Sequence, residues 1–177
     1  MSVLSTVVIS LEPQSPTVIS LVNALSALGF KAEVFSAIDG RSAMPDLRDA
    51  ESVDQKMSVL RRRSELTTSE VGCFLSHARV IQQAFDNGVD KLLILEDDVE
   101  ILAGFAEVVD AIVTLPSEVE MVRLMGLKRR RRKTIATLAG SWQLVRPLRG
   151  WCGAQAYVMN RPAMAKFLRQ YQTISMP

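Results

Sequence analysis

The sequence is poor in the residues that build disulfide frameworks and metal clusters, with two cysteines and one histidine among 177 residues. Cys73 and Cys152 lie far apart and form no closely spaced metal or redox motif, so we expect two reduced thiols in a cytosolic protein. The N-terminus lacks a basic segment followed by an apolar core and a cleavage site, which predicts no signal peptide. No apolar run is long enough to cross a bilayer.

Other common signatures are missing as well. The chain has no internal repeat and no glycine-rich phosphate cradle, which disfavours a phosphoryl-transfer enzyme. A net charge of +2 is too small to indicate a general nucleic-acid binder. Hydrophobic residues make up 48% and charged residues 23%, as in ordinary globular proteins. We expect one domain over residues 1–177, truncated at its C-terminus, because no cap signal precedes Pro177.

The most informative stretch is Lys91–Glu100, in which an apolar run meets a cluster of carboxylates. Leu92–Leu95 shows no alternation of polar and apolar residues, which predicts a strand buried on both faces of a parallel sheet. Carboxylates crowded at its end, at Glu96, Asp97 and Asp98, repel one another unless a cation lies between them. Ligands bind at this end of strands in open α/β sheets, so we predict a Mn²⁺ or Mg²⁺ site, although an acidic turn is the simpler alternative.

The N-terminal part of the chain alternates between strand and helix patterns. The residue patterns predict a strand over Val3–Leu11, a helix over Thr17–Leu28 and a second strand over Lys31–Ala37. These three elements form a βαβ unit, which predicts a parallel sheet. Asp39-Gly40 follows the second strand. This pair is common in turns, but its place at the ligand-binding edge is equally compatible with a binding role.

A long helix is expected near the middle of the chain. Thr67 and Glu70 have the spacing of a capping box, and the helix should continue to about Asn87. His77, the single histidine, lies near the edge of its apolar face, where a hydrogen-bonded structural role is more common than a catalytic one. Cys73 lies four residues before His77, a spacing that suits a metal, but no third ligand is close in the sequence.

The rest of the chain continues the alternation. Further elements are expected as an exposed helix or ordered excursion over Asp46–Arg63, a helix over Gly104–Leu115, strands over Glu120–Gly126, Ser141–Leu148 and Ala154–Met159, and a last helix from Pro162 to about Tyr171. Six consecutive basic residues, Lys128–Lys133, predict a solvated loop that could also contact phosphates or anionic lipid. No aromatic residues alternate with these cations, so we predict no nucleic-acid partner.

Four segments together resemble one family. They are Phe35–Gly40, Leu66–His77, Leu93–Val99 and Gly153–Met159, and the second, with its Glu-x-Gly-Cys-x-x-Ser-His pattern, is the most specific. In order and spacing they resemble glycosyltransferase family 25, the lipopolysaccharide or lipooligosaccharide biosynthesis glycosyltransferases.

The resemblance implies an α/β fold of the GT-A type, a doubly wound, mainly parallel sheet flanked by helices. It also implies a metal-dependent enzyme that transfers a sugar, typically galactose, from a UDP-sugar donor to a lipid-linked glycan acceptor. Such an enzyme would be cytoplasmic and could contact the inner membrane through Lys128–Lys133.

The resemblance carries over to site residues one by one. Asp98 is expected as the principal ligand of the Mn²⁺ or Mg²⁺ ion, with Glu96 beside it. The catalytic candidates are Glu70, His77 and again Asp98. The donor-binding candidates are Ser10, Asp39, Gly40, Asp97 and Tyr157. Glu70 and His77 could instead hold their helix in place. The segment Ser10–Pro13 replaces a basic segment of the family, so donor contacts there could be lost or moved.

Two alternatives belong to other functional classes. The first is a sugar-nucleotide or glycan-binding module of the same fold with weak or no turnover. The second is an adaptor at the membrane surface that acts through Lys128–Lys133. Release of UDP in the presence of acceptor separates the enzyme from the binding module. The adaptor should lose its association with the membrane when Lys128–Lys133 are neutralised.

Overall fold

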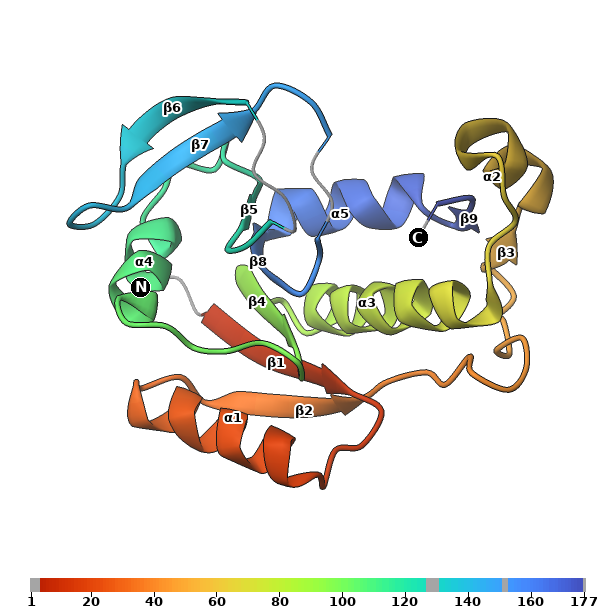
Figure 1. The fold of residues 1–177 in the computed structure, drawn as a ribbon, viewed down its shortest axis with the longest axis horizontal. Coiled ribbons are helices and arrows are strands. Elements are labelled where there is room, and N and C mark those ends of the chain that lie inside the picture. Colours follow the sequence, from red (N-terminus) through yellow and green to blue (C-terminus); the bar gives the residue numbers. More distant parts are fainter. Residues whose placement is uncertain (1–3, 127–130, 151–152, 177) are drawn as a thin grey trace.

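The computed structural model describes residues 4–126, 131–150 and 153–176. Within them, the core is a five-stranded sheet in the order β2-β1-β4-β8-β5, with β4 at its centre (Figure 1). The strands are β1 (Leu4–Ser10), β2 (Ala32–Ser36), β4 (Lys91–Glu96), β5 (Met121–Arg123) and β8 (Ala156–Asn160). The predicted central strand is therefore confirmed, and its apolar run is fully buried.

The sheet is mixed rather than mainly parallel. β1 pairs in parallel with both β2 and β4, as the predicted βαβ unit requires. β8 is antiparallel to both of its neighbours, β4 and β5. The reason is the connection, because the chain leaves β5, makes an excursion and returns at the same end of the sheet. Such a return produces an antiparallel partner, whereas a helical crossover produces a parallel one.

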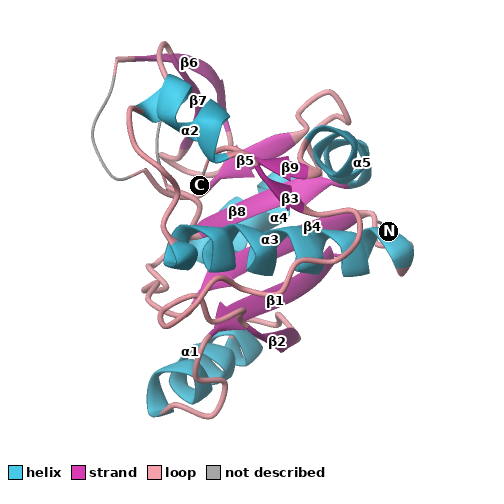
Figure 2. Ribbon diagram, turned by 90° about the vertical axis from the view of Figure 1, so that its right-hand side faces the viewer, coloured by secondary structure: helices cyan, strands magenta, loops and turns pink. Residues whose placement is uncertain are grey.

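Helices cover both faces of the sheet, as expected for a doubly wound α/β protein. α1 (Pro16–Ala27) and α4 (Phe105–Val113) share one apolar cluster with Leu93 and Leu95 of β4. α3 (Thr68–Asp86) and α5 (Arg161–Gln170) share the other cluster with Leu92 and Ile94. Figure 2 shows α3 lying across the strands. Alternate residues of β4 thus enter opposite cores, which explains why the strand has no polar face.

Two small additions lie outside this sheet. The region expected as an exposed helix contains β3 (Ser52–Val53) and the short helix α2 (Gln55–Arg62), and β3 pairs with β9 (Thr173–Ile174) near the end of the chain. A separate hairpin consists of β6 (Arg132–Thr137) and β7 (Gln143–Pro147).

The hairpin changes one expectation about the basic run. Arg132 and Lys133 begin strand β6 rather than belonging to a loop, while 128–130 and Cys152 lie outside the described residues. Among the helices of the described ranges, none is both long and apolar enough to cross a lipid bilayer.

Candidate functional site

The carboxyl ends of β1 and β4 lie side by side and bring two candidate residues, Ser10 and Asp97, together. Parallel pairing sets Ile9 of β1 opposite Glu96 of β4. Ser10 follows Ile9 and is buried, and its hydroxyl donates a hydrogen bond to Oδ2 of Asp97. The same hydroxyl oxygen accepts a bond of 2.9 Å from the backbone N–H of Glu12. Ser10 therefore orients Asp97 and ties the acidic turn to the first strand.

Glu96 points toward α3 instead of toward its neighbour Asp98. Its Oε1 lies 3.0 Å from Nε2 of His77 and 4.0 Å from Sγ of Cys73. The other ring nitrogen of His77, Nδ1, lies 2.9 Å from the hydroxyl of Tyr157. Tyr157 belongs to β8, which pairs with β4 at Ile94. The fold thus joins residues from α3, β4 and β8 in one chain of polar contacts, which is buried at Tyr157 and His77 and exposed at Cys73.

Electrostatics in this chain favour a charged imidazole. Burial by itself would lower the pKa of His77, but hydrogen bonds to Cys73 and Glu96, with the negative charge at those partners, raise it to about 9. Burial, with Glu96 and Cys73 nearby, also raises the pKa of Tyr157. Tyr157 therefore remains a neutral hydroxyl beside the ring. Both ring nitrogens of His77 therefore have polar partners, Tyr157 at Nδ1 and Glu96 at Nε2.

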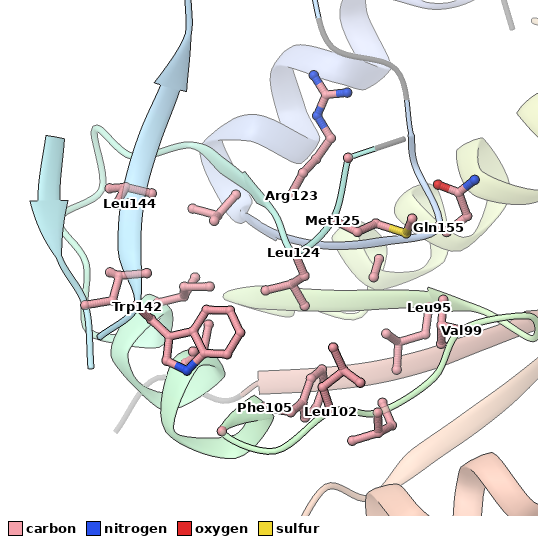
Figure 3. A pocket seen from close by; sticks show the side chains of 18 of the residues that line it. Leu95, Val99, Leu102, Phe105, Arg123, Leu124, Met125, Trp142, Leu144 and Gln155 are labelled. Carbon is pink, nitrogen blue, oxygen red and sulfur yellow. The ribbon is translucent and has the colours of Figure 1, made fainter. Parts of the chain in front are cut away.

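Asp98 lines the wall of a pocket of about 760 Å³. The pocket lies between the turn after β4, helix α4 and the hairpin (Figure 3). The lining is mostly apolar, with Phe105 and Trp142 among its aromatic rings and Arg123 and Gln155 among its polar groups. Burial, followed by the charges of Glu96 and Asp97, raises the pKa of Asp98.

The side chain of Gln155, at the same pocket, has an unpaired polar atom. Its Oε1 is buried and has no hydrogen-bond partner within the described ranges. A buried acceptor without a partner is costly, and such a group often awaits a ligand or water. Gln155 also accepts from the backbone N–H of Glu96 through its carbonyl, at 2.7 Å, so the residue is fixed beside the acidic turn.

The remaining candidates lie elsewhere, around the beginning of α3. Asp39 is half exposed and forms an ion pair of 2.8 Å with Arg41, whose guanidinium hydrogen bond lowers the pKa of Asp39. A Cβ atom added at Gly40 would lie 2.0 Å from the carbonyl oxygen of Thr68, so the chain crosses the helix too closely for any side chain. Gly72 of α3 lies at the same crossing, next to the backbone of Ile38 and Gly40. These contacts give the Asp-Gly pair a clear structural role, and its role in donor binding stays a prediction.

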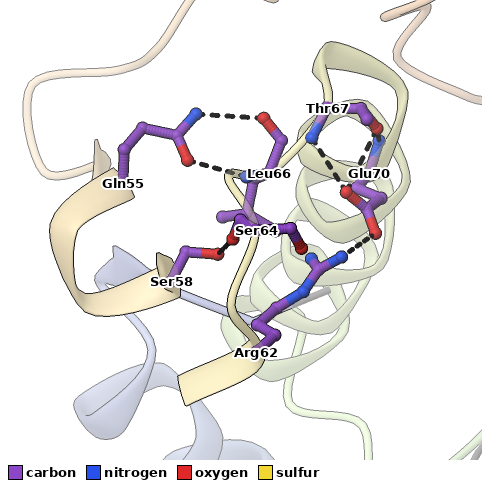
Figure 4. A network of polar contacts seen from close by, with 7 residues as sticks. All are labelled: Gln55, Ser58, Arg62, Ser64, Leu66, Thr67 and Glu70. Atoms are coloured by element: carbon purple, nitrogen blue, oxygen red, sulfur yellow. Dashed lines mark hydrogen bonds and ion pairs between the residues drawn. The ribbon is translucent and has the colours of Figure 1, made fainter. Parts of the chain in front are cut away.

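Glu70 is held at the same helix end (Figure 4). The predicted capping box is confirmed, because Thr67 and Glu70 exchange side-chain and backbone hydrogen bonds. Oε1 of Glu70 also lies 2.7 Å from Nη2 of Arg62 on α2. Both carboxylate oxygens are thus occupied, an arrangement that favours the helix-holding alternative over a catalytic one.

Sequence reasoning missed several residues of these sites. The spacing of Cys73 and His77 suits a metal, but the third residue of this group, Glu96, lies 19 residues after His77. Arg123 and Trp142 line the pocket without belonging to any recognised motif, and Gln155, although within the segment Gly153–Met159, was not singled out as a site residue. Only the three-dimensional arrangement of the loops brings them to the acidic turn.

Comparison with known proteins agrees with this arrangement. A mouse protein named inactive glycosyltransferase 25 family member 3 is 30% identical over 100 residues, which cover 55% of this chain and 17% of the mouse protein. An Aedes aegypti protein named glycosyltransferase 25 family member is 32% identical over 94 residues, or 51% of this chain and 15% of that protein. The matched part is thus less than a fifth of either relative's own length.

A family model described as glycosyltransferase family 25 (LPS biosynthesis protein) matches residues 4–177. The four segments that suggested the resemblance all fall within this match, and they supply α3, β4 and β8 around the acidic turn. Since the match extends over nearly the whole chain, the protein belongs to glycosyltransferase family 25.

Proposed function

We propose that this chain is a metal-dependent glycosyltransferase with a GT-A type fold, which moves a sugar, galactose being the expected one, from a UDP-sugar to a lipopolysaccharide-type, lipid-linked glycan. The observation that carries the proposal is the acidic turn at the carboxyl end of β4, with Asp98 at the wall of a largely apolar pocket. Open α/β sheets bind their ligands at this end of the strands.

The donor set fits a hard divalent cation. Asp97 and Asp98 offer carboxylate oxygens, the ligand type that Mn²⁺ and Mg²⁺ prefer. Asp98 is the principal candidate, and Asp97 is already oriented by the hydroxyl of Ser10. Glu96 was predicted as the partner of Asp98, but its carboxylate contacts His77 on α3. When bound, the cation would offset the charge that develops on the departing diphosphate.

The pocket provides groups suited to the rest of a sugar nucleotide. The ring of Trp142 offers an apolar surface for stacking, and sugars and bases both have such faces. Gln155 offers a buried acceptor for a hydroxyl or N–H of the ligand. Arg123 contributes positive charge at the wall, where its guanidinium also donates to the carbonyl of Gly153. Glu70, His77 and Tyr157 act in this proposal by positioning the turn and the helix.

Calorimetric titration of UDP into the protein, with and without Mn²⁺, tests the proposal. Wild-type protein should bind UDP only when Mn²⁺ is present, and Asp98→Ala should lose that dependence together with most of the affinity. Asp110→Ala, which removes an exposed carboxylate on α4, is the matched control and should bind like wild type. Metal-independent binding, or full affinity in Asp98→Ala, would contradict the assignment.

A second candidate function is nucleotide or glycan binding without turnover. The mouse relative and a rat relative carry names that describe them as inactive or probably inactive, which is the observation that favours it. The two functions differ in one product. Incubation with UDP-galactose and a lipooligosaccharide acceptor should release UDP if the chain is a transferase, and binding without release would indicate the binding module.

Peripheral contact with the inner membrane from the cytoplasm is part of the same proposal. In the hairpin, Lys133 of β6 lies opposite Arg146 of β7, and both are exposed together with Arg132. Each cation near an anionic surface contributes about 1 kcal/mol. Sedimentation with phosphatidylglycerol vesicles should therefore fall in a variant with Arg132→Glu and Lys133→Glu, but not in Arg169→Glu on α5. Equal sedimentation of both variants would rule out this surface.

A further inference from the structure

Three side chains of different ligand types converge beside the acidic turn. One ligand atom from each of Cys73, His77 and Glu96 lies within 4.8 Å of the other two. In the described part of the chain this is the one group of three or more such residues close enough to hold a metal ion. Cys73 is exposed and forms no disulfide, so the group opens to solvent.

We infer that Cys73, His77 and Glu96 form a zinc-type metal site, separate from the oxygen-ligand site assigned to Asp97 and Asp98. Two of its ligands come from one helix, where residues four apart lie on the same face one turn from each other. The third comes from the end of β4, the central strand. The site would therefore link α3 to the sheet directly beneath the acidic turn.

The distances suit a tetrahedral ion. Zinc binds sulfur at about 2.3 Å and nitrogen or oxygen at about 2.0 Å, so neighbouring ligand atoms around a tetrahedral ion lie about 3.3–3.6 Å apart. Oε1 of Glu96 is 3.0 Å from Nε2 of His77 and 4.0 Å from Sγ of Cys73. Shifts of about half an ångström, within the reach of a Glu side chain, would bring both distances to the required values.

The surroundings of His77 also match those of a metal ligand. Nδ1 of the ring lies 2.9 Å from the hydroxyl of Tyr157, and the two rings are stacked with centroids 5.7 Å apart. A ligating histidine usually bonds a partner through its second nitrogen, which fixes the ring and its tautomer. Tyr157 is buried and well placed to do this, and it leaves Nε2 directed at Glu96 and the open side.

The ligand types decide which metal is favoured. A thiolate and an imidazole are softer ligands than the oxygens that Mn²⁺ and Mg²⁺ prefer, and they select zinc and its neighbours. With three protein ligands among the described residues, the fourth position is free for water or another ligand, as in catalytic rather than structural zinc sites. Occupation of this site would keep Glu96 turned toward α3. It would leave Asp97 and Asp98 as the carboxylates on the pocket side.

Metal titration of the chelator-treated full chain tests the inference without relying on transferase activity. One equivalent of Zn²⁺ should bind at least about 100-fold more tightly than Mn²⁺. Co²⁺ in place of Zn²⁺ should give the intense visible bands of a tetrahedral ion and a thiolate-to-cobalt charge-transfer band in the near ultraviolet. The charge-transfer band reports directly on sulfur as a ligand.

Variants distinguish the metal ligands from Tyr157, which orients the ligand His77. Cys73→Ser should lose the charge-transfer band and His77→Gln should lose tight binding, whereas Tyr157→Phe should weaken Zn²⁺ binding by about 10–100-fold. Cys152→Ser is the matched control and should retain the band and the affinity. Circular dichroism confirms that each variant is folded, and Cys73→Ser alters only an exposed side chain. Absence of stoichiometric Zn²⁺ binding, a band that survives in Cys73→Ser, or a band lost in Cys152→Ser would overturn the inference.

Discussion

At the residue scale, single side chains that were chosen as catalytic candidates prove to have several structural partners. Glu70 accepts hydrogen bonds from Arg62 on α2 and from the backbone and hydroxyl of Thr67. Its carboxylate therefore serves two purposes, since it caps α3 and connects that helix to α2. Removal of such a group should be visible in stability before it is visible in chemistry.

The pH dependence of stability tests this role of Glu70. The hydrogen bond from Arg62, opposed by burial and assisted by Thr67, lowers the pKa of Glu70 from its usual 4.5. A carboxyl group whose pKa is lower in the folded state stabilises the fold above its unfolded pKa, and this contribution disappears as pH falls through the folded pKa. Urea unfolding should therefore show Glu70→Gln less stable than wild type near pH 7, with the difference vanishing in acid.

The matched control is Glu118→Gln, which alters an exposed carboxylate after α4 and should leave stability unchanged at both pH values. If Glu70→Gln lowers the free energy of unfolding as much in acid as near pH 7, the charge of the carboxylate is not what holds the helix end. Donor binding measured on the same variant distinguishes a catalytic contribution, because a purely structural residue should leave the affinity for UDP and Mn²⁺ nearly intact.

At the element scale, the crossing of the chain over α3 depends on two glycines. A Cβ atom at Gly72 would lie 2.6 Å from the carbonyl oxygen of Ile38, and the backbone nitrogen of Gly40 would be 3.0 Å away. Ala in a helix is normally better than Gly by about 1 kcal/mol. At Gly72 the clash with backbone should outweigh this gain, so Gly72→Ala should lower the melting temperature. Gly150→Ala, where a Cβ meets nothing within 4 Å, should not.

Elements with strong local signals were the ones that the sequence predicted well. The capping box and apolar spacing placed α3 within a residue of its observed ends, and the uninterrupted apolar run of β4 announced burial on both faces. β7 falls within the predicted strand Ser141–Leu148, but the direction of β8, the strand β6 and its pairing with β7 were not predictable in this way. Strand pairing is decided by partners distant in the sequence, and the hairpin shows mostly exposed residues with no buried face.

The same distinction between local patterns and long-range contacts applies to the candidate site. Asp97 and Asp98 could be proposed as site residues because three carboxylates after an apolar strand are conspicuous in any sequence. The grouping of Cys73, His77 and Glu96 could not, since the packing of α3 on β4 decides which residues of the two elements meet. The same packing brings the carboxylate of Glu96, which the sequence pairs with Asp98 as a metal ligand, into contact with His77.

At the scale of the whole molecule, stability depends on two cores that share one central strand. Leu92 and Leu93 are adjacent and both fully buried, but they enter opposite clusters, Leu92 with α3 and α5 and Leu93 with α1 and α4. A sheet with one solvent-exposed face would bury only one of two neighbouring residues. Both layers of helices are therefore needed to bury the strand that carries the acidic turn.

Paired substitutions in β4 test this two-sided arrangement. Leu92→Ala and Leu93→Ala should each lower the free energy of unfolding by about 2–5 kcal/mol, because each removes a buried side chain and leaves a cavity. Leu60→Ala on α2, where the side chain is 77% exposed, should change it by less than about 0.5 kcal/mol. Urea unfolding monitored by circular dichroism gives all three values. A small cost at either β4 position would mean that one face of the sheet is not covered in solution, and the acidic turn would then lack the rigid support that a donor site requires.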